Sequence, residues 1–350
     1  MDKLLIGTIR GAIKRNPNVL KKYFKSDEFY FAESIDDPKL KDIDVFIQTN
    51  LLKYKFFLAN RNDQYEYILK SGKPKLVMES PMFRSVENVG EKKGLYRLGW
   101  NSYQYHDSDY NNKNSPPDRW KWMESTYNIK RKDWKSNGEY VLFTMQKPGD
   151  SSLNELYTKQ GYRNYWVWAE DTVKEIRKNT DRKIIIRPHI NQQVNGNRHA
   201  EDICTRIDNC EVSKNYEWHP NFGASGGTGL QRDLDNAWCT VTYNSLSAVE
   251  SVMSGTPVIT MHKGAMAWPV AHHSLADIES LNRNIDITQW LYDSAYTSWT
   301  GQEFSSGAVW NHLKPRYEYW RDNTHHIIKD ALYDLNELAK LPRKVKWNSQ

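Results

Sequence analysis

The chain has 350 residues, of which 39% are hydrophobic and 26% charged, a composition that fits a folded globular protein and excludes an intrinsically disordered one. Because this length exceeds what one compact core usually holds, we expect two domains. No apolar run approaches the length of a membrane-spanning helix, and the N-terminal region becomes charged at Arg10, before a signal-peptide core forms. Cys204, Cys210 and Cys239 lack the spacing of a zinc site or a disulfide framework. We therefore expect a cytoplasmic protein with no membrane span.

Positive charge is concentrated in the first 135 residues, although the net charge of the whole chain is only +6. Residues 1–25 contain seven Lys and Arg against one Asp, and residues 119–135 contain six against two acidic residues. Tryptophan and tyrosine are mixed with the second run, and this combination favours a polyanion with stackable bases. The candidate acceptor or DNA contacts are Lys14, Arg15, Lys130, Arg131, Lys132 and Trp134. The alternative interpretation is a solvated basic surface without a ligand.

The first half predicts short buried strands at residues 44–48 and 75–79, the second of which ends at Ser80-Pro81. Turn-forming residues dominate residues 101–119 and predict a long loop. Asp107 and Asp109 form a DxD pattern in this loop, the pattern with which some transferases hold a metal-bound diphosphate. Because no apolar strand leads into this pattern, we assign no metal.

From Gly138 onward, apolar strands alternate with amphipathic helices. The patterns predict strands at residues 140–145, 183–189, 237–243 and 257–260, and helices at residues 166–177, 245–254 and 310–341. This alternation predicts βαβ units and a parallel sheet, whose ligands bind beyond the carboxyl ends of the strands. We place the domain boundary near residue 136.

The most detailed motif covers residues 242–258, in which a strand runs into Asn244 and Ser245 at the start of a predicted helix. A helix start offers free N–H groups and the positive end of its dipole to a phosphate. Ser247 belongs to the same set, and Glu250, in the expected second turn, can accept hydrogen bonds from ribose or sugar hydroxyls. The alternative is an ordinary βαβ turn with a capping Ser and a surface Glu.

Two further motifs follow predicted strands. Arg187-Pro188-His189 places a guanidinium and an imidazole where both can contact a diphosphate. Residues 146–152 form a Gly- and Ser-rich turn that presents N–H groups to an anion, with Asp150 as its best-placed carboxylate for chemistry. The alternatives are a structural His and an Asp that only caps the following helix. We also expect residues 262–273, which follow the last strand, to line the same pocket.

Together these motifs resemble the capsular-polysaccharide glycosyltransferase family, which includes bacterial Kdo transferases and is related in motif style to bacterial sialyltransferases. The resemblance covers about residues 138–271 and rests on Q-x-x-x-D-x-S, K/R-P-H and N-S-x-x-x-x-E-x-x-x-x-G-x-P-V, in that order. It implies an α/β protein of GT-B type, in which two Rossmann-like domains face each other across a cleft. We assign residues 1–136 to an acceptor-binding domain, 137–305 to a nucleotide-sugar-binding domain, and 306–350 to a helical tail that crosses back.

The resemblance also implies roles for individual residues. Asp150 and His189 would be catalytic, and the donor would be held by Gln146, Ser152, Arg187, Asn244, Ser245, Ser247 and Glu250. The implied donor is a UDP- or CMP-sugar, with no prosthetic group and no metal. Two features depart from the family: Ile190 follows His189 where the family usually has Pro, and a Gly-rich stretch occupies residues 222–229. That stretch is either a mobile linker or a loop that wraps the diphosphate.

The sequence leaves two classes of acceptor open. The family glycosylates surface polysaccharide lipids, but the basic, aromatic first domain and the single-module build look like a bacteriophage protein, which would be located in the cytoplasm of the host cell. Phage DNA glycosyltransferases share the GT-B plan and modify 5-hydroxymethylpyrimidines such as 5-hydroxymethylcytosine, which enzymes reach by base flipping. We therefore expect a DNA-modifying glycosyltransferase, with a capsule or lipopolysaccharide glycosyltransferase as the first alternative. A non-catalytic nucleic-acid- or glycan-binding protein and a nucleotide-sugar epimerase are the others.

Overall fold

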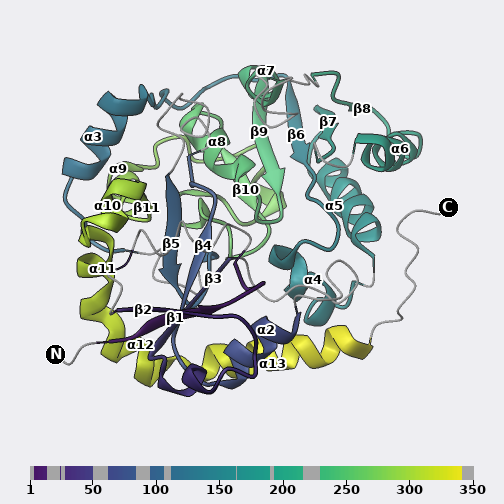
Figure 1. The fold of residues 1–350 in the computed structure, drawn as a ribbon. Helices are drawn as coiled ribbons and strands as arrows, with labels where there is room; N and C mark the ends of the chain where they lie inside the picture. The colour runs from purple at the N-terminus through teal and green to yellow at the C-terminus, as the bar shows by residue number, and fades with distance from the viewer. Residues whose placement is uncertain are drawn as a thin grey trace.

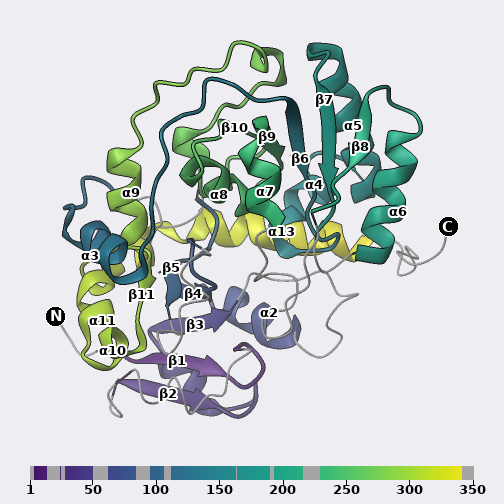
Figure 2. The same cartoon turned by 90° about the horizontal axis from the view of Figure 1, so that it is seen from above.

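The structure is a computed structural model that describes residues 4–13, 24, 28–49, 62–83, 95–105, 112–162, 164–189, 193–215 and 229–340. Two separate sheets organise these residues (Figures 1 and 2). The first sheet has the order β11-β5-β4-β3-β1-β2, and the second has the order β10-β9-β6-β7-β8. The expected α/β architecture is confirmed, with one unit built around each sheet: the first unit around the first sheet and the second unit around the second.

The first sheet is mixed. Its strands are β1 (Ile6–Ile9), β2 (Phe29–Ala32), β3 (Val45–Thr49), β4 (Lys75–Glu79), β5 (Tyr96–Trp100) and β11 (Ser298–Trp299). The first four strands run parallel, whereas β5 is antiparallel to β4 and β11 is antiparallel to β5. Strands β1, β3 and β5 are buried along their whole length because helices cover both faces of the sheet.

The second sheet is entirely parallel. Its strands are β6 (Tyr140–Thr144), β7 (Lys183–Arg187), β8 (Cys210–Val212), β9 (Ala237–Thr242) and β10 (Val258–Thr260). Four of them coincide, within two residues at each end, with strands that the sequence predicts. One face packs on α5 (Tyr165–Asn179), whose first turn is capped by the Asn164 side chain, which accepts a hydrogen bond from Trp166 N. The alternation of strands and helices in the sequence therefore predicts the parallel sheet of this unit correctly.

The remaining helices surround the sheets and cross between them (Figure 2). They are α2 (Asn62–Lys70), α3 (Asp118–Tyr127), α4 (Asn154–Thr158), α6 (Gln193–Cys204), α7 (Gly229–Asp235), α8 (Ser247–Met253), α9 (Thr288–Ala295), α10 (Gly301–Ser305), α11 (Ala308–Leu313), α12 (Tyr317–Asn323) and α13 (His325–Lys340). Short 3₁₀ turns occur at η1 (Pro38–Asp42), η5 (Ser151–Leu153), η8 (Trp268–Val270), η9 (Leu275–Asp277) and η10 (Lys314–Arg316). In the part of the chain that is described, no helix has both the length and the apolar character needed to span a membrane.

The C-terminal tail returns to the first sheet, as expected, but not as one helix. It is divided into α11, α12 and α13, and the first break coincides with Pro315, which cannot continue an α-helix. Trp310 and Trp320 pack in the same core as β1, β3 and β5. Helix α13 then contacts both α2 of the first unit and α4 of the second, so that it lies along both units (Figure 1).

Two segments depart from the expected domain boundaries. Strand β11 lies within residues 137–305 but pairs with β5 of the first sheet. Residues 118–135, assigned to the first domain, instead pack in one core with α8 and α9 of the second unit. Gly255, expected to end α8, makes this packing possible: its φ is +73°, and a Cβ there would lie 2.0 Å from the carbonyl oxygen of Asp133. Sequence periodicity does not encode such close approaches.

The cysteines also form a contact that their spacing does not indicate. Cys204 ends α6 and Cys210 begins β8, and their Sγ atoms lie 2.8 Å apart. Cys239 is buried separately in the second core. All three are free thiols.

A buried ion pair ties α3 to the edge of the first sheet. The Arg119 guanidinium is 8% exposed, pairs with Glu303, and donates from Nε to the carbonyl oxygens of Ala295 (2.9 Å) and Ser298 (3.1 Å). Burial alone would raise the pKa of Glu303, but hydrogen bonds from Arg119 and Thr300 outweigh it and lower that pKa. The ionised carboxylate therefore stabilises the fold at neutral pH, and this contribution is lost as the pH falls through the folded pKa.

Replacing Arg119 by Ala should reduce the free energy of unfolding by about 1.5 to 3 kcal/mol, because the half-buried Glu303 carboxylate and two carbonyl oxygens lose a charged hydrogen-bond donor. The measurement is urea unfolding at neutral pH. The control is Arg321→Ala, whose ion pair with Asp322 is exposed on both sides and should cost less than about 1 kcal/mol. Equal losses in the two variants would contradict the assignment of Arg119 as a structural tie.

Candidate functional site

Three residues from two predicted motifs meet in a buried hydrogen-bonded cluster beyond the carboxyl ends of β6 and β9. Gln146 Nε2 donates to Asn244 Oδ1 at 2.8 Å, and Gln146 Oε1 accepts from the Asn244 backbone N at 2.9 Å. Asn244 Nδ2 donates to the Ser152 carbonyl oxygen at 2.8 Å, and Gln146 Nε2 lies 3.2 Å from Ser152 Oγ. The oxygen and the nitrogen of each side-chain amide have partners within the cluster, so the cluster fixes the turn between Gln146 and Ser152.

Residues that the sequence did not single out extend this cluster. Gln104, from the loop after β5, donates from Nε2 to the Ser152 carbonyl oxygen at 3.1 Å and so joins the first unit to the cluster. His262 lies in the stretch expected to line the pocket. Its Nδ1 accepts from Gly264 N at 3.0 Å, which leaves Nε2 to donate to Glu155 Oε2 at 3.3 Å. No motif signals Gln104, because it lies in a stretch without periodicity.

Asp150 is half-buried at the start of η5. Its Oδ1 accepts from the Ser152 backbone N at 3.0 Å, which is the capping role considered as the alternative. A catalytic role for the same carboxylate stays a prediction.

Tyr103 of the first unit lies near enough to Asp150 for the charge of that carboxylate to affect its pKa. Tyr103 OH lies 3.0 Å from Ser151 Oγ, and desolvation, reinforced by the charge of Asp150, raises the pKa of Tyr103 well above its usual value. The charge of Glu79, at the end of β4, also raises the pKa of Tyr103. The charge of Arg97, the register partner of Glu79 on β5, lowers it. Tyr103 therefore stays protonated at neutral pH and can donate a hydrogen bond beside the carboxylate.

Arg187 has a protein partner. Its guanidinium is buried and pairs with Asp233, whose side chain is 2% exposed. Asp233 also accepts from Ser213 Oγ and Asn215 Nδ2, both at 2.7 Å. The positive charge expected to face a diphosphate is thus balanced inside the second unit, and direct contact between Arg187 and a ligand stays a prediction.

The start of α8 differs in detail from the expectation. Ser245 does not cap the helix: the N-cap position is Leu246, and Ser245 Oγ accepts from Ser247 N at 3.2 Å. Ser247 Oγ lies 2.7 Å from Thr144 Oγ1 of β6. Because α8 begins at Ser247, Glu250 lies in the first turn rather than the second and is half-buried. His189 is half-buried two residues beyond β7, at the same edge of the sheet.

Among the residues that the structure describes, the expected acceptor or DNA contacts do not gather at this edge. Lys132 N donates to the carbonyl oxygen of Met253, at the carboxyl end of α8, whereas the cluster lies at its amino end. Lys130 is exposed, Arg131 and Trp134 are half-buried, and the Trp134 indole donates to the Ile285 carbonyl oxygen at 2.9 Å. The Lys132 ammonium lies 3.5 Å from an Asp235 carboxylate.

Several other residues that the sequence analysis names lie outside the described ranges. Lys14 and Arg15 are outside the described residues, as are Ile190, Asp107 and Asp109, and residues 222–228 of the Gly-rich stretch. In the described ranges, no three or more His, Cys, Asp or Glu side chains gather in a way that could hold a metal ion.

Comparison with known proteins gives similarity to solved structures only. No family model matches the sequence, and no curated protein sequence is similar to it. Thermosulfurimonas dismutans KpsC, described as a β-Kdo 2,4 transferase, is 16% identical with a TM-score of 0.48, over 86% of this chain and 93% of that one. A KpsC structure from the same organism, described as a β-Kdo 2,7 transferase, is 12% identical with a TM-score of 0.48, over 87% and 98%.

Replacing Asn244 by Asp tests the cluster. The new carboxylate cannot donate to the Ser152 carbonyl oxygen, and it leaves two acceptors facing each other in a buried site. The free energy of unfolding, measured in urea, should fall by about 1 to 3 kcal/mol. Asn284→Asp, at an exposed position, is the matched control and should change it by less than about 0.5 kcal/mol. An unchanged stability in Asn244→Asp would show that the amide network is not what holds this turn.

Proposed function

We propose that the chain is a glycosyltransferase that moves a sugar from a nucleotide-activated donor to an acceptor hydroxyl. The observation that carries the proposal is the cluster of Gln146, Ser152 and Asn244, because it brings two separate motifs together where parallel α/β sheets bind ligands. Gln104 and Tyr103 bring the first unit to the same edge. A transferase needs such a junction, since donor and acceptor must meet between two surfaces.

In this proposal the second unit binds a UDP- or CMP-sugar. Charge develops on the leaving phosphate, and preorganised donors stabilise it without a metal ion. His189 is the proposed donor to that phosphate, and Ser245 and Ser247 supply hydroxyls beside it. Glu250 is the proposed acceptor for ribose or sugar hydroxyls.

Asp150 is the proposed catalytic carboxylate. As a general base it would take the proton of the acceptor hydroxyl, and the anomeric configuration would invert. As a nucleophile it would form a covalent glycosyl ester, and the configuration would be retained. Its half-buried position next to the protonated Tyr103 suits either role, and the anomeric configuration of the product distinguishes them.

For the acceptor we propose a saccharide hydroxyl, as in capsule or lipopolysaccharide synthesis, in preference to 5-hydroxymethylcytosine in DNA. The reason is positional: the described basic and aromatic residues expected to contact DNA lie at the opposite end of α8 from the cluster. DNA stays the second candidate because the N-terminal basic residues, Lys14 and Arg15, lie outside the described ranges.

The decisive assay measures release of free nucleotide from a panel of UDP- and CMP-sugars with saccharide acceptors. Asp150→Asn should lower turnover by about 100-fold or more, since the loss of general acid–base catalysis typically costs that much. Asp208→Asn, an exposed control in the same unit, should keep full turnover. Full turnover in Asp150→Asn would remove both proposed roles of this carboxylate.

The same assay separates the alternative classes. A non-catalytic binding protein would release no nucleotide from any donor, and an epimerase would alter the donor sugar with no acceptor present.

We expect the protein not to bind hydroxymethylcytosine-containing duplex DNA in the way a DNA-modifying enzyme would, with an affinity that falls steeply as the salt concentration rises. The measurement is a fluorescence titration between about 50 and 200 mM salt, the range in which proteins with many phosphate contacts lose most of their affinity. Tight, salt-sensitive binding together with glycosylated nucleosides in mass analysis would instead establish the DNA acceptor.

A further inference from the structure

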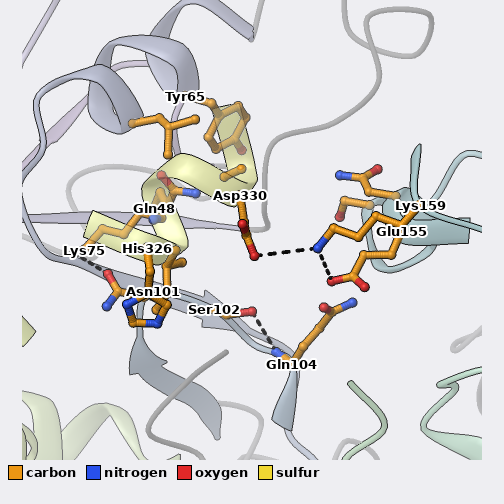
Figure 3. A pocket seen from close by; sticks show the side chains of 15 residues that line it. Gln48, Tyr65, Lys75, Asn101, Ser102, Gln104, Glu155, Lys159, His326 and Asp330 are labelled. Carbon is orange, nitrogen blue, oxygen red and sulfur yellow. Dashed lines mark hydrogen bonds and ion pairs between the residues drawn. The ribbon is translucent and has the colours of Figure 1, made fainter. Parts of the chain in front are cut away.

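A pocket of about 100 Å³ lies where the first sheet, the η5–α4 segment and α13 meet (Figure 3). The first unit contributes Gln48, Lys75 and Asn101, the second unit contributes Ser151 and Glu155, and α13 contributes Asp330. Ser151, which directly follows Asp150 in the chain, is one of the residues that line the pocket. Gln104 lines it as well and connects it to the buried cluster.

Asn101 carries a buried hydrogen-bond donor that the described structure does not use. The residue is 1% exposed, and its Oδ1 accepts from Lys75 N at 3.3 Å and from Thr324 Oγ1 at 3.0 Å. Because the Lys75 backbone N can only donate, the amide oxygen faces it, and Nδ2 is left without a partner. An unsatisfied buried amide N–H costs about 1 to 3 kcal/mol, so a ligand oxygen placed there would be strongly favoured.

The charges around the pocket balance. The lining contains two positively charged side chains, Lys75 and Lys159, and two negatively charged ones, Glu155 and Asp330. Lys159 Nζ lies 3.1 Å from Glu155 and 3.7 Å from Asp330. His326 is the other titratable side chain in the lining. A phosphate or a nucleotide would require a clear excess of positive charge, which this lining does not have.

The polar lining mixes donors and acceptors, and one wall is apolar. Gln48 and Ser102 supply amide and hydroxyl groups, while Tyr65, Leu69 and Ile327 supply carbon surface. Sugar hydroxyls both donate and accept hydrogen bonds, and the C–H face of a pyranose packs against apolar side chains. The chemistry of the pocket therefore matches a neutral saccharide better than an anion or a stacked base.

We propose that this pocket binds one neutral monosaccharide unit, the terminal unit of the saccharide acceptor, with a ring or hydroxyl oxygen that accepts from Asn101 Nδ2. The inference rests on the proposed function, since it names the substrate class and place of that function's acceptor. A ligand held here contacts both units and α13, and its contact with Ser151 is one residue along the chain from Asp150.

Binding is tested on the full chain by ligand-observed NMR titration with methyl α-D-glucopyranoside and methyl β-D-galactopyranoside, with glucuronate as the charged comparison. At least one neutral glycoside should bind, and glucuronate should bind more weakly. Asn101→Asp, which keeps the acceptor for Lys75 and Thr324 but cannot donate, should weaken binding about 10-fold, equivalent to about 1.4 kcal/mol.

A second variant covers the case in which Asn101→Asp fails to fold. Ala331 lines the pocket from α13, and Ala331→Leu fills it without removing a polar group, so it should weaken binding by at least about 10-fold. Lys329→Ala, exposed on the same helix, is the matched control and should bind as the wild type does. Unchanged binding in folded pocket variants, preference for glucuronate, or no binding of either neutral glycoside would overturn the proposal.

Nucleotide release distinguishes failure of this inference from failure of the proposed function. If the wild type releases nucleotide with a saccharide acceptor but Ala331→Leu leaves the acceptor KM unchanged, the pocket proposal fails and the transferase stands. If the pocket binds a glycoside but no donor is turned over, the proposed function fails and the saccharide site stands without its acceptor role.

Discussion

The turn from Gln146 to Ser152, on which the centre of the candidate site is built, depends on the hydrogen bonds between Gln146 and Asn244. Each of the two side chains uses its oxygen and its nitrogen within the cluster, and both nitrogens also reach Ser152. An unpaired amide in a buried environment costs free energy. Conformations of the turn that leave one of these polar groups without a hydrogen bond are therefore disfavoured. The Ser152 carbonyl oxygen accepts from both Asn244 and Gln104, and that shared oxygen ties the second unit to the first.

The fold of the second unit follows from local pattern, whereas much of the first does not. Strands β6, β7, β9 and β10 are apolar runs bounded by turn residues, and parallel strands covered on both faces have this appearance. Strand β11 has only two residues and exists because Ser298 and Trp299 pair with β5, about two hundred residues earlier. Its assignment requires the tertiary structure, since nothing within a window around residue 298 indicates a partner.

In the candidate site, too, the sequence predicts some residues and contacts but not others. Motif spacing brings out Gln146, Ser152 and Asn244 because they follow strands whose carboxyl ends share an edge. Spacing cannot reveal that the Arg187 charge is matched by Asp233, since the pair forms only when α7 packs beside β7. Composition is equally silent on Asn101, whose left-handed backbone (φ 64°) and buried amide result from its position after β5.

The distribution of charge explains why the composition of the chain indicates a DNA acceptor, whereas the positions of its charged side chains fit a saccharide acceptor better. Several charged side chains near the candidate site are balanced by neighbours: Arg187 by Asp233, and Lys159 by Glu155 and Asp330. A net charge of +6 describes the long-range field of the chain, which affects encounter rates, and says nothing of which groups face a ligand. Recognition at short range depends on desolvated donors and acceptors instead. At this junction they are amides, hydroxyls and paired ions, a set that matches the hydroxyls of a sugar.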